Sequence, residues 1–208
     1  MSADAGRGPA APRGGLPCPR RRENLGDMST PAAEPAGEPL ARFNALPEPD
    51  ALAELLACCA APAWARRVVA GRPYRSLDGV LAASDDAVTG LTDSDLADAL
   101  AGHPRIGERR PDPANPNSRA ASWSRQEQAG MGTADQQTSL AMAELNRAYE
   151  DRFGQIYLVC ATGRSATELL DLLRGRLGND DVTERRVVRG ELAQINRLRL
   201  GKLLAAAG

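Results

Sequence analysis

Helix start and stop signals follow one another closely from residue 50 of this chain onward. Ser76 can cap the start of one helix. Thr92 and Asp95 form a capping-box pattern, which predicts a helix over 93–101 with Gly102 as its stop. The sequence therefore predicts an all-α protein, a compact multi-helix bundle. The same kinds of signal predict further helices at 51–59, 62–70, 77–89, 124–131, 133–153, 165–177 and 181–204.

Two stretches depart from this helical pattern. Residues 156–160 are short, apolar and rich in β-branched side chains, which fits either a buried extended segment or a buried helical turn. Residues 105–121 contain prolines at 111, 113 and 116 and predict a long loop. Loops of that length in a compact domain are often functional, so we expect a lid or a site wall there.

The first 40 residues have a different composition from the rest of the chain. They contain 7 prolines and 6 glycines, so 13 of 40 positions disfavour regular structure. We therefore expect residues 1–40 to be a disordered Pro/Gly-rich extension. Residues 41–208 are expected to form one all-helical domain.

Charge and hydropathy exclude several functional classes. Lys and Arg number 26 against 27 Asp and Glu, so no overall charge attracts the protein to nucleic acid or to anionic lipid. The longest nearly apolar run, 55–65, contains Pro62 and is far shorter than the roughly 20 residues that a spanning helix needs. We therefore predict no nucleic-acid partner and no membrane insertion.

The four cysteines and the single histidine argue against a metal site. The cysteines stand at 18, 58, 59 and 160 without a C-x-x-C pair, as in a reduced cytoplasmic protein. One histidine and scattered cysteines do not supply the three or four N/S ligands of a zinc site. We predict no metal and a cytoplasmic location.

His103 is the first candidate for proton chemistry, because only histidine has an unperturbed pKa inside the physiological range. It follows the predicted helix stop and precedes Pro104, which biases it away from helical backbone. A histidine just past a helix end also acts as a simple cap on the helix dipole. Both interpretations stay open on these residues alone.

Ser124, Glu127 and Gln128 also allow two interpretations. Ser-x-x-Glu is a capping-box pattern, in which the two side chains satisfy backbone amides at a helix start. In the functional interpretation, the same residues lie at a helix N-terminus whose free amides favour an anionic ligand.

Arg199 extends an apolar stripe in the last predicted helix instead of lying on its charged face. The stripe is formed by Val188, Leu192 and Ile195, at spacings of four and three residues. The guanidinium either reaches past the core to water or clamps a carboxylate, with Glu127 or an acidic substrate as its partner. Cys160 similarly is either an inert buried thiol or a nucleophile for His103.

Several motifs together resemble the OHCU (2-oxo-4-hydroxy-4-carboxy-5-ureidoimidazoline) decarboxylase family, and the resemblance covers about residues 41 to 204. The motifs are His103-Pro104-Arg105-Ile106-Gly107-Glu108, Ser124-x-x-Glu127-Gln128, Leu145-Asn146-x-x-Tyr149-x-x-Arg152-Phe153-Gly154, Leu158-Val159-Cys160-Ala161 and Leu198-Arg199-Leu200.

The resemblance implies an all-helical homodimer that uses no cofactor and acts on a small molecule. Its implied reaction is decarboxylation of OHCU to (S)-allantoin, the last step of urate degradation. His103 matches the catalytic acid/base of the family. The residues that match substrate contacts are Pro104, Ser124, Glu127, Gln128 and Arg199, with the backbone of Tyr157, Leu158, Val159, Cys160 and Ala161.

Two rival functions remain on the residues alone. One is a helical interaction module, in which the basic side chains of 185–202 face a protein partner or RNA. The other is a hydrolase with Cys160 as nucleophile and His103 as base.

Overall fold

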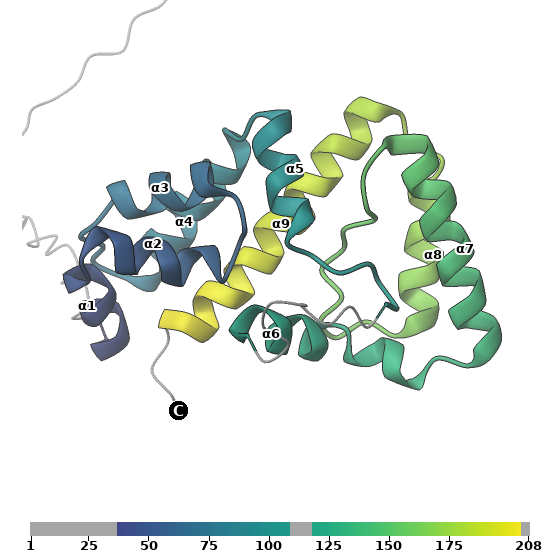
Figure 1. The fold of residues 1–208 in the computed structure, drawn as a ribbon, viewed down its shortest axis with the longest axis horizontal. Coiled ribbons are helices and arrows are strands. Elements are labelled where there is room, and N and C mark those ends of the chain that lie inside the picture. Colours follow the sequence, from purple (N-terminus) through teal and green to yellow (C-terminus); the bar gives the residue numbers. More distant parts are fainter. Residues whose placement is uncertain (1–36, 109–117, 205–208) are drawn as a thin grey trace, which may run out of the picture. The chain divides into compact units, whose positions relative to one another are not determined.

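This computed structural model describes residues 37–108 and 118–204 of the chain. Those residues contain nine α-helices and one 3₁₀ helix, joined by turns and loops, and no strand (Figure 1). The all-α prediction is confirmed. The elements are α1 (Glu38–Ala45), α2 (Glu48–Leu56), α3 (Pro62–Ala70), α4 (Leu77–Thr89), α5 (Asp93–Ala101), α6 (Arg119–Glu127), η1 (Ala129–Thr133), α7 (Gln136–Phe153), α8 (Ala166–Arg176) and α9 (Asp181–Leu204).

The bounds predicted for α3, α4, α5 and α9 agree with the structure. In α5, the Thr92 hydroxyl accepts from the Asp95 N–H at 3.2 Å, and the Asp95 carboxylate accepts from the Thr92 N–H at 3.0 Å. Gly102 ends this helix as predicted. Local capping chemistry therefore sets the helix that leads into His103.

The prediction of a helix over 124–131 is wrong at both ends. The helix begins at Arg119, where the Ser118 hydroxyl accepts from the Ala121 N–H at 3.2 Å, and it ends at Glu127. Because Ala, Arg and Trp at 119–123 continue the helical turn, Ser124 lies inside the helix. Most of the loop expected at 105–121, namely residues 109–117, lies outside the described part of the chain.

Smaller differences occur elsewhere. α1 begins at Glu38, inside the stretch assigned to the N-terminal extension, and residues 1–36 are outside the described part. α2 starts at Glu48, with Pro49 in its first turn, and α7 starts after the Asp135 cap. Proline is well suited to the first turn of a helix, where its missing N–H is not needed.

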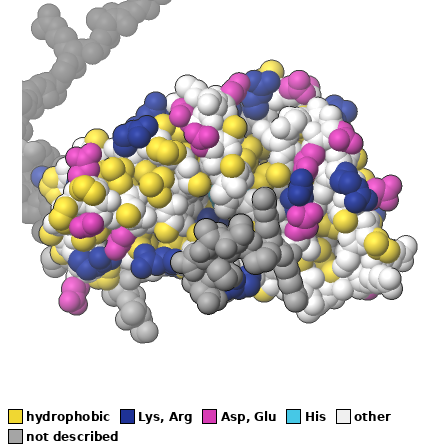
Figure 2. All heavy atoms as spheres, viewed as in Figure 1, with side chains coloured by type: hydrophobic (Ala, Val, Ile, Leu, Met, Phe, Trp, Pro, Cys, Tyr) yellow, Lys and Arg dark blue, Asp and Glu magenta, His cyan; other side chains and the backbone are white. Residues whose placement is uncertain are grey.

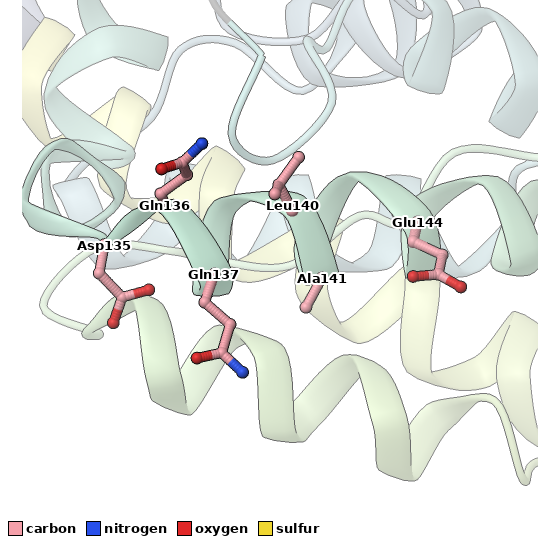
Figure 3. Close-up of a pocket in the computed structure, with 6 residues that line it drawn as sticks. All are labelled: Asp135, Gln136, Gln137, Leu140, Ala141 and Glu144. Atoms are coloured by element: carbon pink, nitrogen blue, oxygen red, sulfur yellow. The ribbon is translucent and has the colours of Figure 1, made fainter.

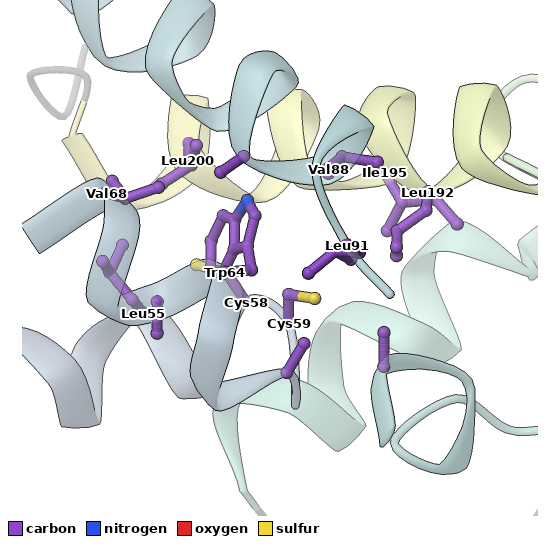
Figure 4. Packing of buried hydrophobic residues seen from close by; sticks show 14 of the residues in the cluster. Leu55, Cys58, Cys59, Trp64, Val68, Val88, Leu91, Leu192, Ile195 and Leu200 are labelled. Carbon is purple, nitrogen blue, oxygen red and sulfur yellow. The ribbon is translucent and has the colours of Figure 1, made fainter. Parts of the chain in front are cut away.

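The core has two clusters of buried apolar side chains. The larger one joins α1–α5 with α9, and Figure 4 shows Trp64 among Leu55, Val68 and Leu200. The Trp64 indole N–H donates to the Ser84 hydroxyl at 3.2 Å, so this buried polar group is satisfied. The smaller cluster joins α7, α8 and the chain around Ile106.

Residues 157–161 form an extended segment between the two clusters. Leu158 and Cys160 belong to the larger cluster, whereas Tyr157, Val159 and Ala161 belong to the smaller one. Side chains of an extended chain alternate between its two faces, which accounts for this division. Of the two structures that the sequence allowed here, the buried extended one is correct.

A buried ion pair fixes this segment to the helices around it. Arg176 of α8 binds Glu184 of α9 and donates to the Leu158 carbonyl at 2.6 Å. The Tyr149 hydroxyl donates to the same carboxylate, and Asn179 donates to its second oxygen at 2.7 Å. The carboxylate is thus satisfied on both oxygens, as a buried charge requires.

Charges of both signs are interspersed on the face shown in Figure 2. Several basic side chains of α9 pair with acidic ones: Arg185 and Arg189 with Asp93, and Arg197 with Asp85. These pairs neutralise much of the positive charge on which an RNA-binding module would depend. No helix within 37–108 and 118–204 has the length and apolar character needed to cross a membrane.

Candidate active site

His103 is held at the C-terminal end of α5 with one ring nitrogen bound and the other unpaired. Its Nδ1 lies 2.9 Å from the Ala99 carbonyl oxygen, so in the neutral ring Nδ1 carries the proton and donates it. The side chain is 8 % exposed, and Nε2 has no hydrogen-bond partner among the described residues. The histidine therefore caps the helix as one interpretation predicted, and it also presents a free lone pair at Nε2.

Burial keeps this imidazole neutral. Loss of water around the ring and, to a smaller extent, the positive charge of Arg199 lower the pKa of His103 from 6.5 to about 4. The Ala99 carbonyl and the Glu127 carboxylate oppose that shift. At pH 7 the ring is consequently a neutral base within electrostatic reach of Arg199 and Glu127.

Arg199 and Glu127 form a bidentate ion pair that is nearly excluded from water. Nε donates to Oε1 at 2.9 Å and Nη2 donates to Oε2 at 2.7 Å. The guanidinium also donates to the Ser124 hydroxyl at 3.1 Å and, through Nη1, to the Cys58 carbonyl at 2.9 Å. Arginine has five N–H donors, and the described residues use four of them, which leaves one on Nη1 for a ligand.

Ser124 and Glu127 do not lie where the anion-binding hypothesis placed them. They occupy the last turns of α6, so the free amides of a helix N-terminus are not beside them. Their spacing of three residues instead places both side chains on one helix face, toward Arg199. The positive charge at this site comes from α9 and not from a helix dipole.

Gln128 follows α6 and connects it to the turn after His103. Its Oε1 accepts from the Gly107 N–H at 3.1 Å, and its Nε2 donates to the Arg105 carbonyl at 3.5 Å. A glutamine amide has two N–H groups and two acceptor lone pairs, so its contacts with the described residues leave one of each unused. Pro104 is half-buried between His103 and this turn.

The extended segment 157–161 has part of its backbone already in use. The Cys160 N–H donates to Glu191 at 2.8 Å, and the Cys160 carbonyl accepts from Arg164 at 3.1 Å. The Leu158 carbonyl is bound by Arg176. The Ala161 carbonyl accepts from the Arg164 N–H at 3.1 Å. The other backbone groups of 157–161, including the N–H and carbonyl of both Tyr157 and Val159, bond to no described residue.

Cys160 lacks the features of a nucleophile. Burial raises the pKa of its thiol, and the charges of Glu191 and Glu127 raise it further. No hydrogen bond joins this thiol to His103 within the described part of the chain. The geometry therefore does not favour the hydrolase alternative.

A separate hollow of about 630 Å³ lies along the first half of α7 (Figure 3). It is lined by Asp135, Gln136, Gln137, Leu140, Ala141 and Glu144 and contains none of the predicted site residues. No cluster of three or more His, Cys, Asp or Glu side chains suited to a metal ion is found among the residues that the structure places.

Sequence reasoning missed several groups that hold the site together. They include the carbonyls of Ala99 and Cys58 and the side chains of Asn146 and Glu191. The carbonyls carry no sequence signal. Asn146 does carry one, because it is a polar residue one turn from Met142 in an otherwise apolar stripe of α7.

Comparisons with known proteins identify relatives over most of the described residues. A sequence model of the OHCU decarboxylase family matches residues 44–201. The chain is 29 % identical over 143 residues to the 2-oxo-4-hydroxy-4-carboxy-5-ureidoimidazoline decarboxylase of Amia calva, covering 69 % of this chain and 81 % of that protein. It is 28 % identical over 148 residues to the uric acid degradation bifunctional protein TTL of Arabidopsis thaliana, covering 71 % of this chain. The chain spans only 45 % of that bifunctional relative.

Solved structures share the fold. An OHCU decarboxylase crystallised in the presence of (S)-allantoin superposes with a TM-score of 0.62 at 24 % identity, over 74 % of this chain and 98 % of that one. An (S)-allantoin synthase gives a TM-score of 0.60 at 15 % identity, over 79 % of this chain and 54 % of that one. At these identities the likeness concerns the fold, and the match over residues 44–201 shows that the chain belongs to the OHCU decarboxylase family.

Proposed function

We propose that this protein decarboxylates 2-oxo-4-hydroxy-4-carboxy-5-ureidoimidazoline to (S)-allantoin, the last step of urate degradation, without a metal or cofactor. Family membership and the names of the relatives support the substrate. The observation that carries the chemistry is the buried neutral His103, whose unpaired Nε2 lies within electrostatic reach of the Arg199–Glu127 pair.

The substrate itself can accept the electrons of the reaction. Its carboxylate is attached to a hydroxyl-bearing carbon beside an imine carbon. When the bond to the carboxylate breaks, CO₂ leaves and the electron pair moves into a new carbon–carbon double bond, with negative charge on the imine nitrogen. Transfer of the hydroxyl proton to that nitrogen and protonation of the former imine carbon then give the ring amide carbonyl of the product and a new C–H bond. One proton is consumed overall, and no external electron acceptor is needed.

In this proposal His103 acts as the proton-transfer group. A neutral imidazole accepts the substrate hydroxyl proton at Nε2 while Nδ1 remains bound to Ala99. An anionic substrate beside the ring raises the pKa of His103, because a nearby negative charge favours imidazolium. The ring that is neutral in the empty site thus becomes a stronger base when the carboxylate arrives.

The remaining predicted residues orient the substrate. Arg199 has one N–H left for a carboxylate or carbonyl oxygen, and Ser124 and Glu127 share its guanidinium. Gln128 offers one donor and one acceptor to the ureido group, whose N–H and C=O are complementary. Pro104 forms one part of the site wall. The backbone of Tyr157, Leu158, Val159, Cys160 and Ala161 forms another, and its N–H and carbonyl groups without a described partner are available to the substrate.

An optical assay tests this function directly. Fresh substrate is generated from urate with uricase and the hydrolase that follows it, and optical rotation is recorded with and without the protein. We expect rapid formation of one enantiomer of allantoin, since spontaneous decay gives a racemate. His103→Asn should slow the reaction by about 10²- to 10⁴-fold with unchanged helical content. Racemic product at the uncatalysed rate would support an interaction module instead.

We further propose that the protein is a cytoplasmic homodimer. The homodimer follows from the family resemblance. The free thiols of Cys58, Cys59 and Cys160 are in keeping with a reducing compartment. Light scattering at micromolar concentration should give twice the chain mass, and a monomer would contradict the dimer.

A further inference from the structure

The turn that follows His103 is bound by a side chain forty residues away in sequence. Asn146 of α7 is 3 % exposed, and its Nδ2 donates to the Ile106 carbonyl at 2.9 Å. Its Oδ1 is buried without a hydrogen-bond partner in the described part of the chain. An apolar residue would fill this position at lower cost if filling the core were all that mattered.

Neighbouring turns of α7 hold the rest of the same segment. Glu150, four residues after Asn146, accepts two hydrogen bonds from Arg105, at 2.5 and 2.7 Å. Met142, four residues before it, lies beside Gly107, where an added Cβ would be 3.6 Å from the methionine side chain. Residues four apart share one helix face, so one stripe of α7 contacts residues 105, 106 and 107 in succession.

The turn has little freedom on its other sides. Gly107 has φ +85°, a conformation that favours glycine, and Gln128 bonds to both ends of the turn. Pro104 fixes one backbone angle between the turn and His103. The Ala99 carbonyl therefore holds the imidazole itself, and the stripe of α7 holds the turn that follows His103 in the sequence.

We propose that Asn146 is a positioning residue for the reaction: by holding the Ile106 carbonyl it sets where the adjoining chain places the His103 ring. This inference rests on the proposed function for its kinetic part. Its structural part concerns only where the ring lies and whether water reaches it.

The single histidine of the chain provides a direct readout. Its ring C–H resonances in an NMR spectrum arise from one residue, so the imidazole can be titrated without assignment. The wild-type ring should titrate near pH 4, because it is buried and lies near Arg199. A ring that moves toward water should titrate nearer the ordinary value of 6.5.

Two variants of Asn146 test the proposal. Asn146→Leu keeps the branched four-atom side chain and removes both polar atoms, and Asn146→Ala removes the N–H donor with the rest of the side chain. Neither adds a charge that would itself shift the imidazole pKa. We expect each to raise the imidazole pKa by about one unit or more and to lower kcat on the order of 10- to 100-fold, with KM changed by less than about threefold. Arg147→Leu, on the exposed face of the same helix, is the matched control and should change neither quantity.

The outcomes separate positioning from stability. A merely structural role predicts lower activity only in proportion to the folded fraction, with the imidazole pKa of folded protein unchanged. The proposal is overturned if the variants keep either the wild-type titration or the wild-type kcat. If the wild-type protein does not decarboxylate the substrate, the proposed function fails, and the titration alone then decides the role of Asn146.

Discussion

Arg199 of α9 and Glu127 of α6 are joined by two hydrogen bonds in a site where both side chains are less than 10 % exposed. The pair connects the last helix of the chain to the helix that carries Ser124 and leads to Gln128. Removing one partner from a buried pair leaves an uncompensated charge, which is much more costly than losing an exposed pair. This ion pair therefore contributes to the fold and to the site at once.

Arg199→Ala should lower the free energy of unfolding by about 3 to 5 kcal/mol, because it leaves Glu127 buried without its cation. Urea denaturation monitored by circular dichroism measures this loss. Arg199→Lys keeps the charge but not the two parallel hydrogen bonds, so we expect it to fold better than the alanine variant and still lose most of kcat/KM.

Arg197→Ala is the matched control for that prediction. Arg197 lies two residues earlier on the same helix, and its ion pair with Asp85 is exposed to solvent. The Arg197→Ala substitution should leave both the free energy of unfolding in urea and kcat/KM close to those of the wild type. Equal losses in the two alanine variants would contradict the special role of the buried pair.

The stability of the protein should fall as the pH is lowered from about 6.5 toward 4. Burial lowers the pKa of His103 from 6.5 to about 4 in the folded state. Between these values the unfolded chain binds more protons than the folded one, so acid favours unfolding. Between pH 7 and pH 5 this effect amounts to about 2 kcal/mol.

His103→Asn isolates that contribution. The free energy of unfolding in urea is measured for both proteins at pH 7, 6 and 5. Protonation of carboxylates affects both proteins equally, so the difference between their unfolding free energies reports the histidine alone. We expect the gap between the two proteins to change with pH in this window. Parallel curves would show that the ring titrates alike in the folded and unfolded states.

Much of the fold could be predicted because its signals are local. The predicted capping box at Thr92 involves residues three apart and is present in the structure, which contains a second one at Ser165. Arg199 could be singled out for a related reason, since a charged residue within an apolar helical stripe needs a partner. Glu127, one of the partners considered, is the one that the structure places there.

The error at α6 has a physical cause. Ser124 and Glu127 are three residues apart, which suits a capping box, but the same spacing also places two side chains on one face inside a helix. Sequence alone did not show that Arg199, more than seventy residues later, lies opposite that face. The contact of Asn146 with Ile106 was missed for the same reason, since it depends on how α7 packs.

Thr92→Ala should separate helix stability from site geometry. The substitution removes the N-cap of α5, which typically costs about 1 kcal/mol. His103 lies at the opposite end of this helix, where the Ala99 carbonyl and the turn at 105–107 hold it. We therefore expect a lower urea midpoint with kcat/KM near wild type when assays are run well below the melting temperature. A large loss of kcat in fully folded protein would show that the start of α5 also sets the ring position.

Gly130→Ala should destabilise the contact between η1 and the start of α8, whereas Gly132→Ala in the same 3₁₀ helix should not. A Cβ at Gly130 would collide with the carbonyl oxygen of Arg164, a backbone atom that cannot rotate away, but a Cβ at Gly132 meets nothing within 4 Å. Overpacking of this kind typically costs about 1 to 3 kcal/mol. Because Arg164 also donates to the Cys160 carbonyl in the extended segment, we expect Gly130→Ala to raise KM as well. Thermal denaturation and initial rates on the two variants measure both effects, and similar behaviour of the two would contradict the close approach at Gly130.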